Sequence, residues 1–193
     1  MDDSSHIILG IDPGLANTGW GVIRVSSKSV SCIAYGCVST PSHHELSRRL
    51  FKIYDQIRAV VRKYEPKSVG IETVWFGDNT SSAFATGQAR GAALVACAEH
   101  SLSVGEFTPA QIKLSITGTG SAEKQQMQYM VKQHLGLADI PKPDHAADAL
   151  AAAICYTSCA IPGSSSSRLE AMIEKAIERD ERQRNLVKLE AGK

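Results

Sequence analysis

Residues 6–14 read His-Ile-Ile-Leu-Gly-Ile-Asp-Pro-Gly, a short apolar run that ends in an acid and a tight turn. Isoleucine favours β-strands, and Pro followed by Gly is a strong turn signal. The sequence therefore predicts a strand over residues 6–11, with Asp12 at its end. A carboxylate in this position lies at the edge of a sheet, where ligands usually bind, but it can equally serve to cap the turn.

The chain on either side of Ser42 continues this strand pattern and then changes to a helical one. Residues 19–25 and 30–38 are predicted strands joined by a polar loop, which favours an antiparallel opening. A helix is predicted to begin near Ser42, because Ser42 and Glu45 form a capping box, and to stop at Pro66. Further strands are predicted at residues 68–73 and 103–107, and further helices at residues 80–100, 109–116, 121–135 and 144–156. This order describes an α/β protein with a mixed five-stranded sheet flanked by helices.

The last part of the chain has a different composition. Pro162 and the Gly-Ser-Ser-Ser-Ser run at residues 163–167 are typical of a linker. A charged segment with a short apolar stripe follows. We therefore expect one domain over residues 1–160 and, over residues 161–193, a linker and a charged tail that is helix-prone.

Composition excludes few classes of protein. The 43% of apolar residues is ordinary for a globular domain, no apolar run is long enough to span a membrane, and the first residues do not form a secretory signal. We expect a cytoplasmic protein with no membrane partner. The five cysteines contain no Cys-x-x-Cys pair and are odd in number, which favours reduced thiols.

The charge is balanced. The chain has 21 Lys plus Arg and 20 Asp plus Glu, and up to Ser167 there are fourteen of each sign. Any contact with a nucleic acid must then come from a local patch, because there is no overall positive field.

A second acid, Glu72, ends another apolar run, Val69-Gly70-Ile71, and is followed by Val74, Trp75 and Phe76. A carboxylate inside such a run is costly to bury unless it is paired or binds a cation. The alternative is an exposed strand end.

A third group of acids opens an alanine-rich helix at Asp144-His145-Ala146-Ala147-Asp148. Helix capping explains Asp144 but not Asp148, which is placed among small apolar residues. His145 and Asp148 are three residues apart and share a helix face. Three separate elements thus each offer an acid. Such oxygen ligands suit Mg²⁺ or Mn²⁺, and a pair of these ions can activate water for phosphodiester cleavage.

Four blocks of sequence, in order and with compatible spacing, resemble the RuvC family of Holliday junction resolvases. The likeness runs from about Ile7 to Tyr156. The blocks are Ile8-Leu9-Gly10-Ile11-Asp12-Pro13-Gly14 with Thr18-Gly19; Ile71-Glu72-Thr73-Val74-Trp75-Phe76 with Gly87-Gln88-Ala89-Arg90-Gly91; Gly118-Thr119-Gly120-Ser121-Ala122-Glu123-Lys124; and His145-Ala146-Ala147-Asp148-Ala149-Leu150.

The resemblance implies a ribonuclease-H-like fold and a homodimer that makes paired metal-dependent cuts in a four-way DNA junction. It also suggests a RuvAB-type branch-migration complex as a partner. It assigns the metal site, with two ions, and catalysis to Asp12, Glu72, His145 and Asp148. The family has Asp or His at the position of His145, and an imidazole suits Mn²⁺ better than Mg²⁺. Asp144 is the alternative ligand at this place.

The same resemblance suggests DNA contacts. Trp75, with Phe76 beside it, takes the place of the family's base-stacking aromatic, although both rings could instead belong to the core. Lys113 and Lys124 resemble the family's DNA-contacting lysines, and Arg90 is a further candidate contact. An ordinary surface position is the alternative for each lysine.

Two other functions compete with a nuclease. The Gly10-Ile11-Asp12-x-Gly14 pattern also resembles the first phosphate loop of actin-like ATPases, but those folds need two such lobes, and 193 residues are too few. A junction-binding protein without nuclease activity is the other alternative, against which the set of acids argues.

Overall fold

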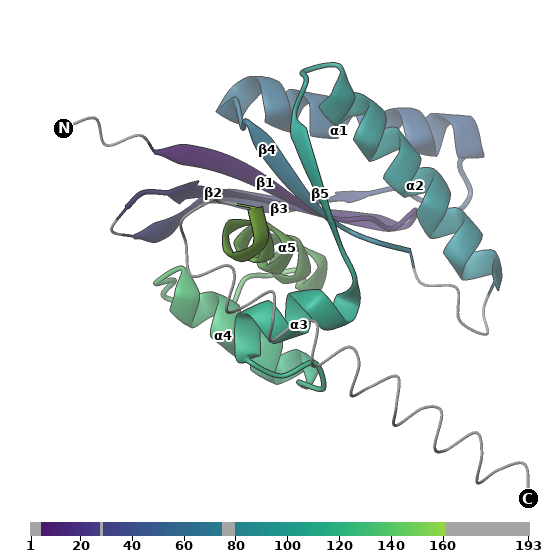
Figure 1. Ribbon diagram of the computed structural model, residues 1–193. Coiled ribbons are helices and arrows are strands. Elements are labelled where there is room, and N and C mark those ends of the chain that lie inside the picture. The colour runs from purple at the N-terminus through teal and green to yellow at the C-terminus, as the bar shows by residue number, and fades with distance from the viewer. Residues whose placement is uncertain (1–4, 28, 75–79, 161–193) are drawn as a thin grey trace, which may run out of the picture.

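A mixed five-stranded sheet forms the centre of the computed structural model, which describes residues 5–27, 29–74 and 80–160. Its strands lie in the order β3-β2-β1-β4-β5 (Figure 1). The antiparallel opening and the five strands predicted from the sequence are confirmed, because β1, β2 and β3 pair antiparallel and β1, β4 and β5 pair parallel. The strands are β1 (His6–Asp12), β2 (Asn17–Val25), β3 (Val30–Ser39), β4 (Ser68–Glu72) and β5 (Ser103–Phe107).

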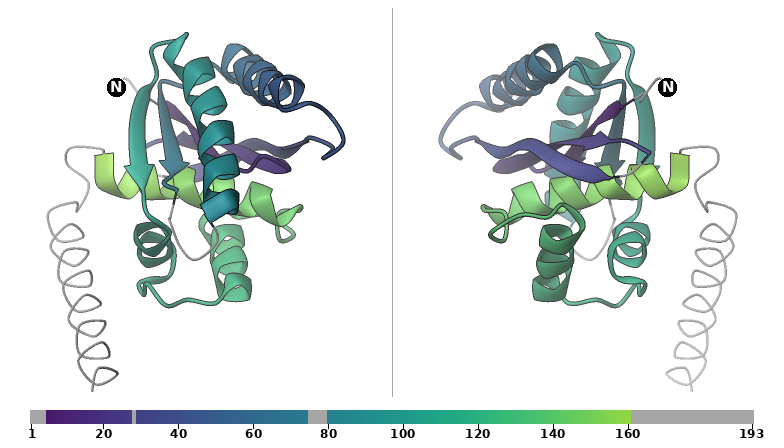
Figure 2. Two further views of the ribbon diagram at one scale, coloured as in Figure 1. Left: turned by 90° about the vertical axis from the view of Figure 1, so that its right-hand side faces the viewer. Right: turned by 90° about the vertical axis from the view of Figure 1, so that its left-hand side faces the viewer.

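Helices cover both faces of this sheet. Helices α1 and α2 lie on one face, while α5 crosses the other face with α3 and α4 beyond it (Figures 1 and 2). The described helices are α1 (Leu46–Tyr64), α2 (Thr80–Ala98), α3 (Pro109–Thr117), α4 (Lys124–His134) and α5 (Asp144–Ala160). In the described part of the chain, no helix is long and apolar enough to cross a membrane.

The alternation of side chains along β1 assigns each residue to one of two cores. Leu9 and Ile11 pack with the apolar side chains of α1 and α2, whereas Ile8 packs with those of α5. Because successive side chains of a strand point to opposite faces, Asp12 lies on the α5 face. The fold therefore places the acid of the first motif opposite the helix that carries His145 and Asp148.

Helix α5 lies unusually close to the sheet because glycines face it. A Cβ at Gly10 would meet the carbonyl oxygen of Ala149, and a Cβ at Gly19 would meet the carbonyl oxygen of His145. The alanines along α5 are buried for the same reason. Small residues on both partners thus let the helix backbone approach the strands, which fixes how far the side chains of its first turn reach.

Two predicted helix starts are wrong. Helix α1 begins at Leu46, with Glu45 as an N-cap that has no side-chain cap hydrogen bond, so the capping box at Ser42 does not form. The N–H of His44 donates to the carbonyl of Pro41, and this turn takes the place of the predicted first helical turn. Helix α4 begins at Lys124 and not at Ser121, because hydroxyl hydrogen bonds hold residues 117–121 in a loop.

Two further predictions concern the cysteines and the end of the chain. The thiols of Cys32, Cys37 and Cys97 are free, as expected for reduced cysteines. The linker and charged tail predicted for residues 161–193 lie outside the described residues.

Candidate metal centre

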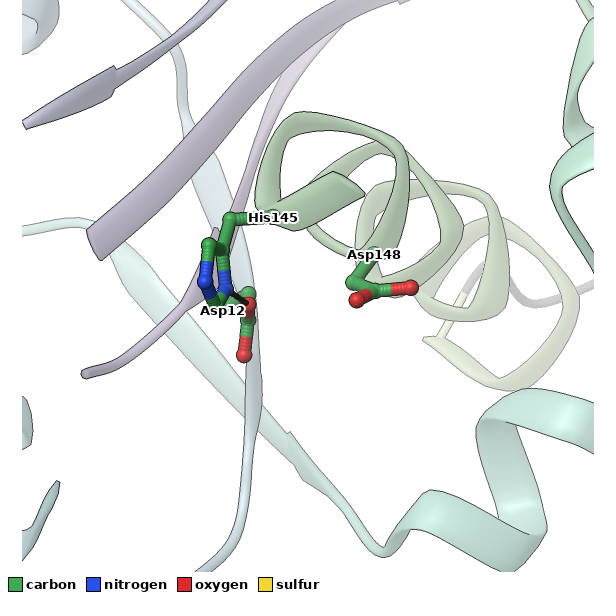
Figure 3. Close-up of side chains that lie close together, drawn as sticks. All are labelled: Asp12, His145 and Asp148. Carbon is green, nitrogen blue, oxygen red and sulfur yellow. Dashed lines mark hydrogen bonds and ion pairs between the residues drawn. The ribbon is translucent and has the colours of Figure 1, made fainter. Parts of the chain in front are cut away.

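Three side chains gather where β1 ends and α5 begins. Asp12, His145 and Asp148 each offer one ligand atom, and these atoms lie within 4.8 Å of one another. Figure 3 shows the imidazole of His145 against Asp12, with Asp148 extending from α5 farther along the helix. This cluster contains three of the four residues that the sequence assigns to the metal.

Local structure holds Asp12 in place. Asp12 pairs with Gly19 in the β1–β2 ladder, and the turn between the two strands is closed by Thr18. The Thr18 hydroxyl, which is fully buried, donates to the carbonyl of Gly14 at 2.8 Å. In the sequence, the place of Thr18 beside Gly19 in the first block is the one signal of this role. Its hydrogen bond stiffens the turn that carries the acid.

The closest contact in the cluster joins Asp12 and His145. His145 Nδ1 lies 2.7 Å from Asp12 Oδ2, and this hydrogen bond is the main reason that the pKa of His145 is raised. A metal ion that takes both atoms as ligands must replace the proton between them. The contact therefore links metal binding to proton release.

Asp148 is a partly buried acid whose pKa is raised although cationic groups lie near it. Burial, and then the charge of Asp12, raise its pKa to about 6. Lys124 opposes this shift from the first turn of α4. A carboxylate that resists ionisation in this way gains most when a cation arrives.

Glu72 reaches the same region from the neighbouring strand. In the β1–β4 pairing Ile11 is opposite Ile71, so Asp12 and Glu72 are the next residues on two adjacent parallel strands. The pKa of Glu72 is raised to about 7. Burial is the main cause, and the negative charges of Asp12 and Asp148 add to it. Glu72 is not one of the three residues within 4.8 Å, but it lies within electrostatic reach of two of them.

These residues fit a divalent cation. The cluster combines carboxylate oxygens with a single imidazole, and the negative charge of Asp12 adds to burial in raising the pKa values of Asp148 and of the neighbouring Glu72. Hard oxygen donors with one nitrogen suit Mg²⁺ or Mn²⁺. The structure thus offers a candidate acidic metal site where β1 ends and α5 begins.

Two lysines predicted to contact DNA also lie near these acids. Lys124 Nζ is 3.0 Å from Asp144 Oδ2 and 3.8 Å from Asp148 Oδ2. Lys113, on α3, lowers the pKa of Glu72 by its charge. Asp144 itself is not in the metal cluster, because its carboxylate faces α4. The geometry thus favours His145 over Asp144 as the ligand.

The remaining predicted contacts are not brought to this centre. The Arg90 guanidinium pairs with Glu106 of β5. Glu106 is opposite Ile71, whose side chain belongs to the core under α1 and α2, so this pair lies on the other face of the sheet. A DNA contact by Arg90 stays a prediction. Trp75 and Phe76 lie outside the described residues.

A mixed sheet in this strand order, with acids at the ends of β1 and β4 and on the helix that crosses them, has the architecture of a ribonuclease-H-like protein. A family model described as crossover junction endodeoxyribonuclease RuvC matches residues 8–156. The chain belongs to the RuvC family of crossover junction endodeoxyribonucleases.

Individual relatives agree with this assignment. A protein of that name from Treponema denticola is 51% identical over 147 residues, which cover 76% of this chain and 83% of that protein. Another, from Heliobacterium modesticaldum, is 48% identical over 149 residues, covering 77% and 92%.

Solved structures agree as well. The structure of T. thermophilus RuvC in complex with a Holliday junction substrate matches with a TM-score of 0.75 and 32% identity, covering 79% of this chain and 93% of that chain. The yeast mitochondrial resolvase Ydc2 matches with a TM-score of 0.55 at 10% identity, covering 87% and 80%, and so shares the fold.

Proposed function

We propose that this chain is a metal-dependent endonuclease of the cytoplasm that resolves four-way DNA junctions in recombination and repair by paired incisions. The observation that carries the proposal is the cluster of Asp12, His145 and Asp148, with Glu72 beside it, in a chain of the RuvC family. The T. thermophilus relative holds a Holliday junction, which supports the same substrate class here.

In this proposal Asp12, Glu72, His145 and Asp148 hold two divalent ions, Mg²⁺ or Mn²⁺. When bound, such ions activate a water molecule and stabilise the leaving oxygen of the cleaved phosphodiester. Asp12 and Glu72, which follow Ile11 and Ile71 on paired strands, form the rigid side of the site. His145 and Asp148 form the side supplied by α5.

The DNA is held by few cations. Lys113 and Lys124 already lie beside the acids and supply positive charge for a backbone phosphate, as the balanced charge of the chain requires. Trp75 and Phe76, which follow Glu72 in the sequence, are proposed to stack on junction bases. Arg90 is given no place at the cut phosphate, because it pairs with Glu106 on the other face.

We also propose a homodimer that packs through the outer face of α2, with a branch-migration complex of the RuvAB type as a further partner. Phe84, Gly87, Gly91 and Val95 follow one another at helical spacing and are all exposed. Among the described residues, the two glycines meet nothing within 4 Å, so the packing seen there does not require them. An apolar face with bare backbone suits a second helix in close contact, and a dimer presents two sites to a junction.

A junction-binding protein without nuclease activity is the alternative function. It is disfavoured because the acids are costly to keep together without a cation, and binding alone needs none of them. The actin-like ATPase reading is disfavoured because the RuvC match covers residues 8–156, almost all of the described domain.

The test is cleavage of a synthetic four-way junction by the full chain with Mg²⁺ or Mn²⁺. Asp12→Asn and Glu72→Gln remove ligand charge with little change of shape, so each variant should still bind the junction but not cut it. Asp55→Asn, on α1 at the other face of the sheet, is the control and should cut normally. Near wild-type cleavage by Asp12→Asn or Glu72→Gln would overturn the proposed metal centre.

A further inference from the structure

The ammonium group of Lys124 is shared between two acids of α5. Lys124 is the first residue of α4, and its Nζ lies 3.0 Å from Asp144 and 3.8 Å from Asp148. These acids are four residues apart, so they present their carboxylates on the same side of the helix. A cation from α4 therefore bridges two turns of α5.

The two acids differ in their relation to the metal centre. Asp148 belongs to the cluster with Asp12 and His145, whereas Asp144 does not. Gln128, one turn farther along α4, adds to Lys124 in lowering the pKa of Asp144. Lys124 thus has one partner inside the metal centre and one partner outside it.

We propose that Lys124 supplies positive charge to Asp148 while the metal is absent, and that Asp144 is a positioning residue that keeps the ammonium group when a metal takes Asp148. The inference rests on the proposed metal centre. A divalent cation on Asp148 repels the ammonium, because like charges a few ångströms apart interact strongly in a partly buried site. Asp144 then offers the displaced charge a partner close to its original position.

This arrangement makes the two residues act on metal affinity with opposite signs. Without its charge, Lys124 no longer competes for Asp148, so the Lys124→Met variant should bind metal more tightly. In Asp144→Asn, the ammonium group of Lys124 keeps only Asp148 of its two acidic partners. It then competes more strongly with the metal for Asp148, so this variant should bind metal more weakly. A simple contact between α4 and α5 would not produce these opposite effects.

The experiment measures Mn²⁺ binding to the full chain without DNA, by titration calorimetry and by the spin-resonance signal of free Mn²⁺. Lys124→Met should lower the dissociation constant, and Asp144→Asn should raise it, each by about three- to tenfold, as expected for partly exposed charges. The double variant Lys124→Met/Asp144→Asn should match Lys124→Met. Both side chains are more than half exposed, so the variants should fold, which their melting temperatures verify.

Two controls separate this proposal from its alternatives. Glu123→Gln removes an exposed negative charge next to Lys124 and should leave the dissociation constant within about twofold of wild type. Asp12→Asn should abolish the tight binding, and if it does not, the metal centre itself is wrong. If Asp12→Asn abolishes binding but Lys124→Met leaves it unchanged or weaker, the competition is wrong and the metal centre stands. An effect of Asp144→Asn that persists in the Lys124→Met background would make Asp144 a ligand and overturn its positioning role.

Discussion

His145 sets the proposed metal centre apart from one built of carboxylates alone. Its Nδ1 contacts Asp12 at 2.7 Å, so the imidazole is already aligned with the strand acid. Because an imidazole is a softer ligand than a carboxylate, we expect Mn²⁺ to support cleavage at least as well as Mg²⁺. His145→Asp should remain active with Mg²⁺. Cleavage rates of the wild type and this variant in the two metals check the expectation.

The alternative is that Asp144, and not His145, is the metal ligand. If His145→Ala cleaves normally while Asp144→Ala does not, Asp144 is the ligand and the geometric assignment is wrong. Loss of Mg²⁺-dependent activity in His145→Asp, with the fold intact, would show that the imidazole is required for more than charge and position.

Glu72 links function to a cost in stability. Its pKa is raised to about 7 in the fold by burial and by Asp12 and Asp148, so the folded state holds this proton more firmly than the unfolded chain does. The contribution of Glu72 to the stability of the metal-free protein is therefore fully present below pH about 4.5. It is lost as the pH rises from about 4.5 through about 7. Asp148, with a pKa of about 6, adds a loss of the same sign at somewhat lower pH.

Glu72→Gln removes the larger part of this loss. At pH 8 with a chelator, we expect the variant to be more stable than wild type by about 1–2 kcal/mol, and at pH 5 by much less. Urea unfolding at the two pH values measures the difference. Asp139→Asn, an exposed acid in the loop before α5, is the control and should show no such gain. A destabilised Glu72→Gln at pH 8 would contradict the electrostatic account, although the variant should not cleave in either case.

At the scale of elements, the sequence predicts what depends on local patterns. Strand ends, the turn after Asp12 and the small residues of α5 are all visible as periodicity or composition. Asp12 and Glu72 are expected in one site from their shared chemistry and from the resemblance to the RuvC family, whereas the pairing of β1 with β4 that places them side by side comes from the structure. The start of α1 could not be predicted, because the turn from Pro41 to His44 competes with the capping signal at Ser42.

Contacts between distant elements carry no local signal. The pairing of Lys124 with Asp144 depends on how α4 packs against α5, and no spacing in the sequence reveals it. Gly87 and Gly91 are a similar case. Glycines in a helix predict close packing, but only the structure shows that they face away from the sheet.

The approach of α5 to the sheet leads to a prediction about Gly10. Gly10→Ala places a methyl group on the backbone of Ala149 and Ala153, so α5 must move away from β1. We expect a loss of about 1–3 kcal/mol in unfolding free energy and weaker Mn²⁺ binding, because Asp148 moves with the helix. Unfolding and metal titration measure both effects. Gly120→Ala, in a loop with room for a methyl group, is the control, and equal behaviour of the two variants would show that the close approach is not required.

At the scale of the whole molecule, the outer face of α2 has an apolar surface that residues 5–27, 29–74 and 80–160 leave exposed. Figure 2 (left) shows α2 on the outside of the domain, and its side chains Phe84 and Val95 are 68% and 60% exposed. Glycines inside a helix cost about 1 kcal/mol each relative to alanine. Gly87 and Gly91 have no compensating contact with any described residue, so close contact with a partner would account for glycines on this face.

The dimer proposed on this face is tested by two kinds of variant. Phe84→Glu should convert the protein to a monomer in analytical ultracentrifugation at micromolar concentration, because it buries a charge between the two helices. The double variant Gly87→Ala/Gly91→Ala should dimerise more weakly and yet unfold at a higher temperature once monomeric, since alanine favours the helix. Tyr129→Glu makes the same kind of change at an exposed ring on α4, on the other side of the sheet; this control variant should stay dimeric.

On a four-way junction, Phe84→Glu should lose the coupling between the two incisions, so that nicked junctions accumulate. A Phe84→Glu protein that sediments as a dimer and still cuts both strands together would place the interface on another face.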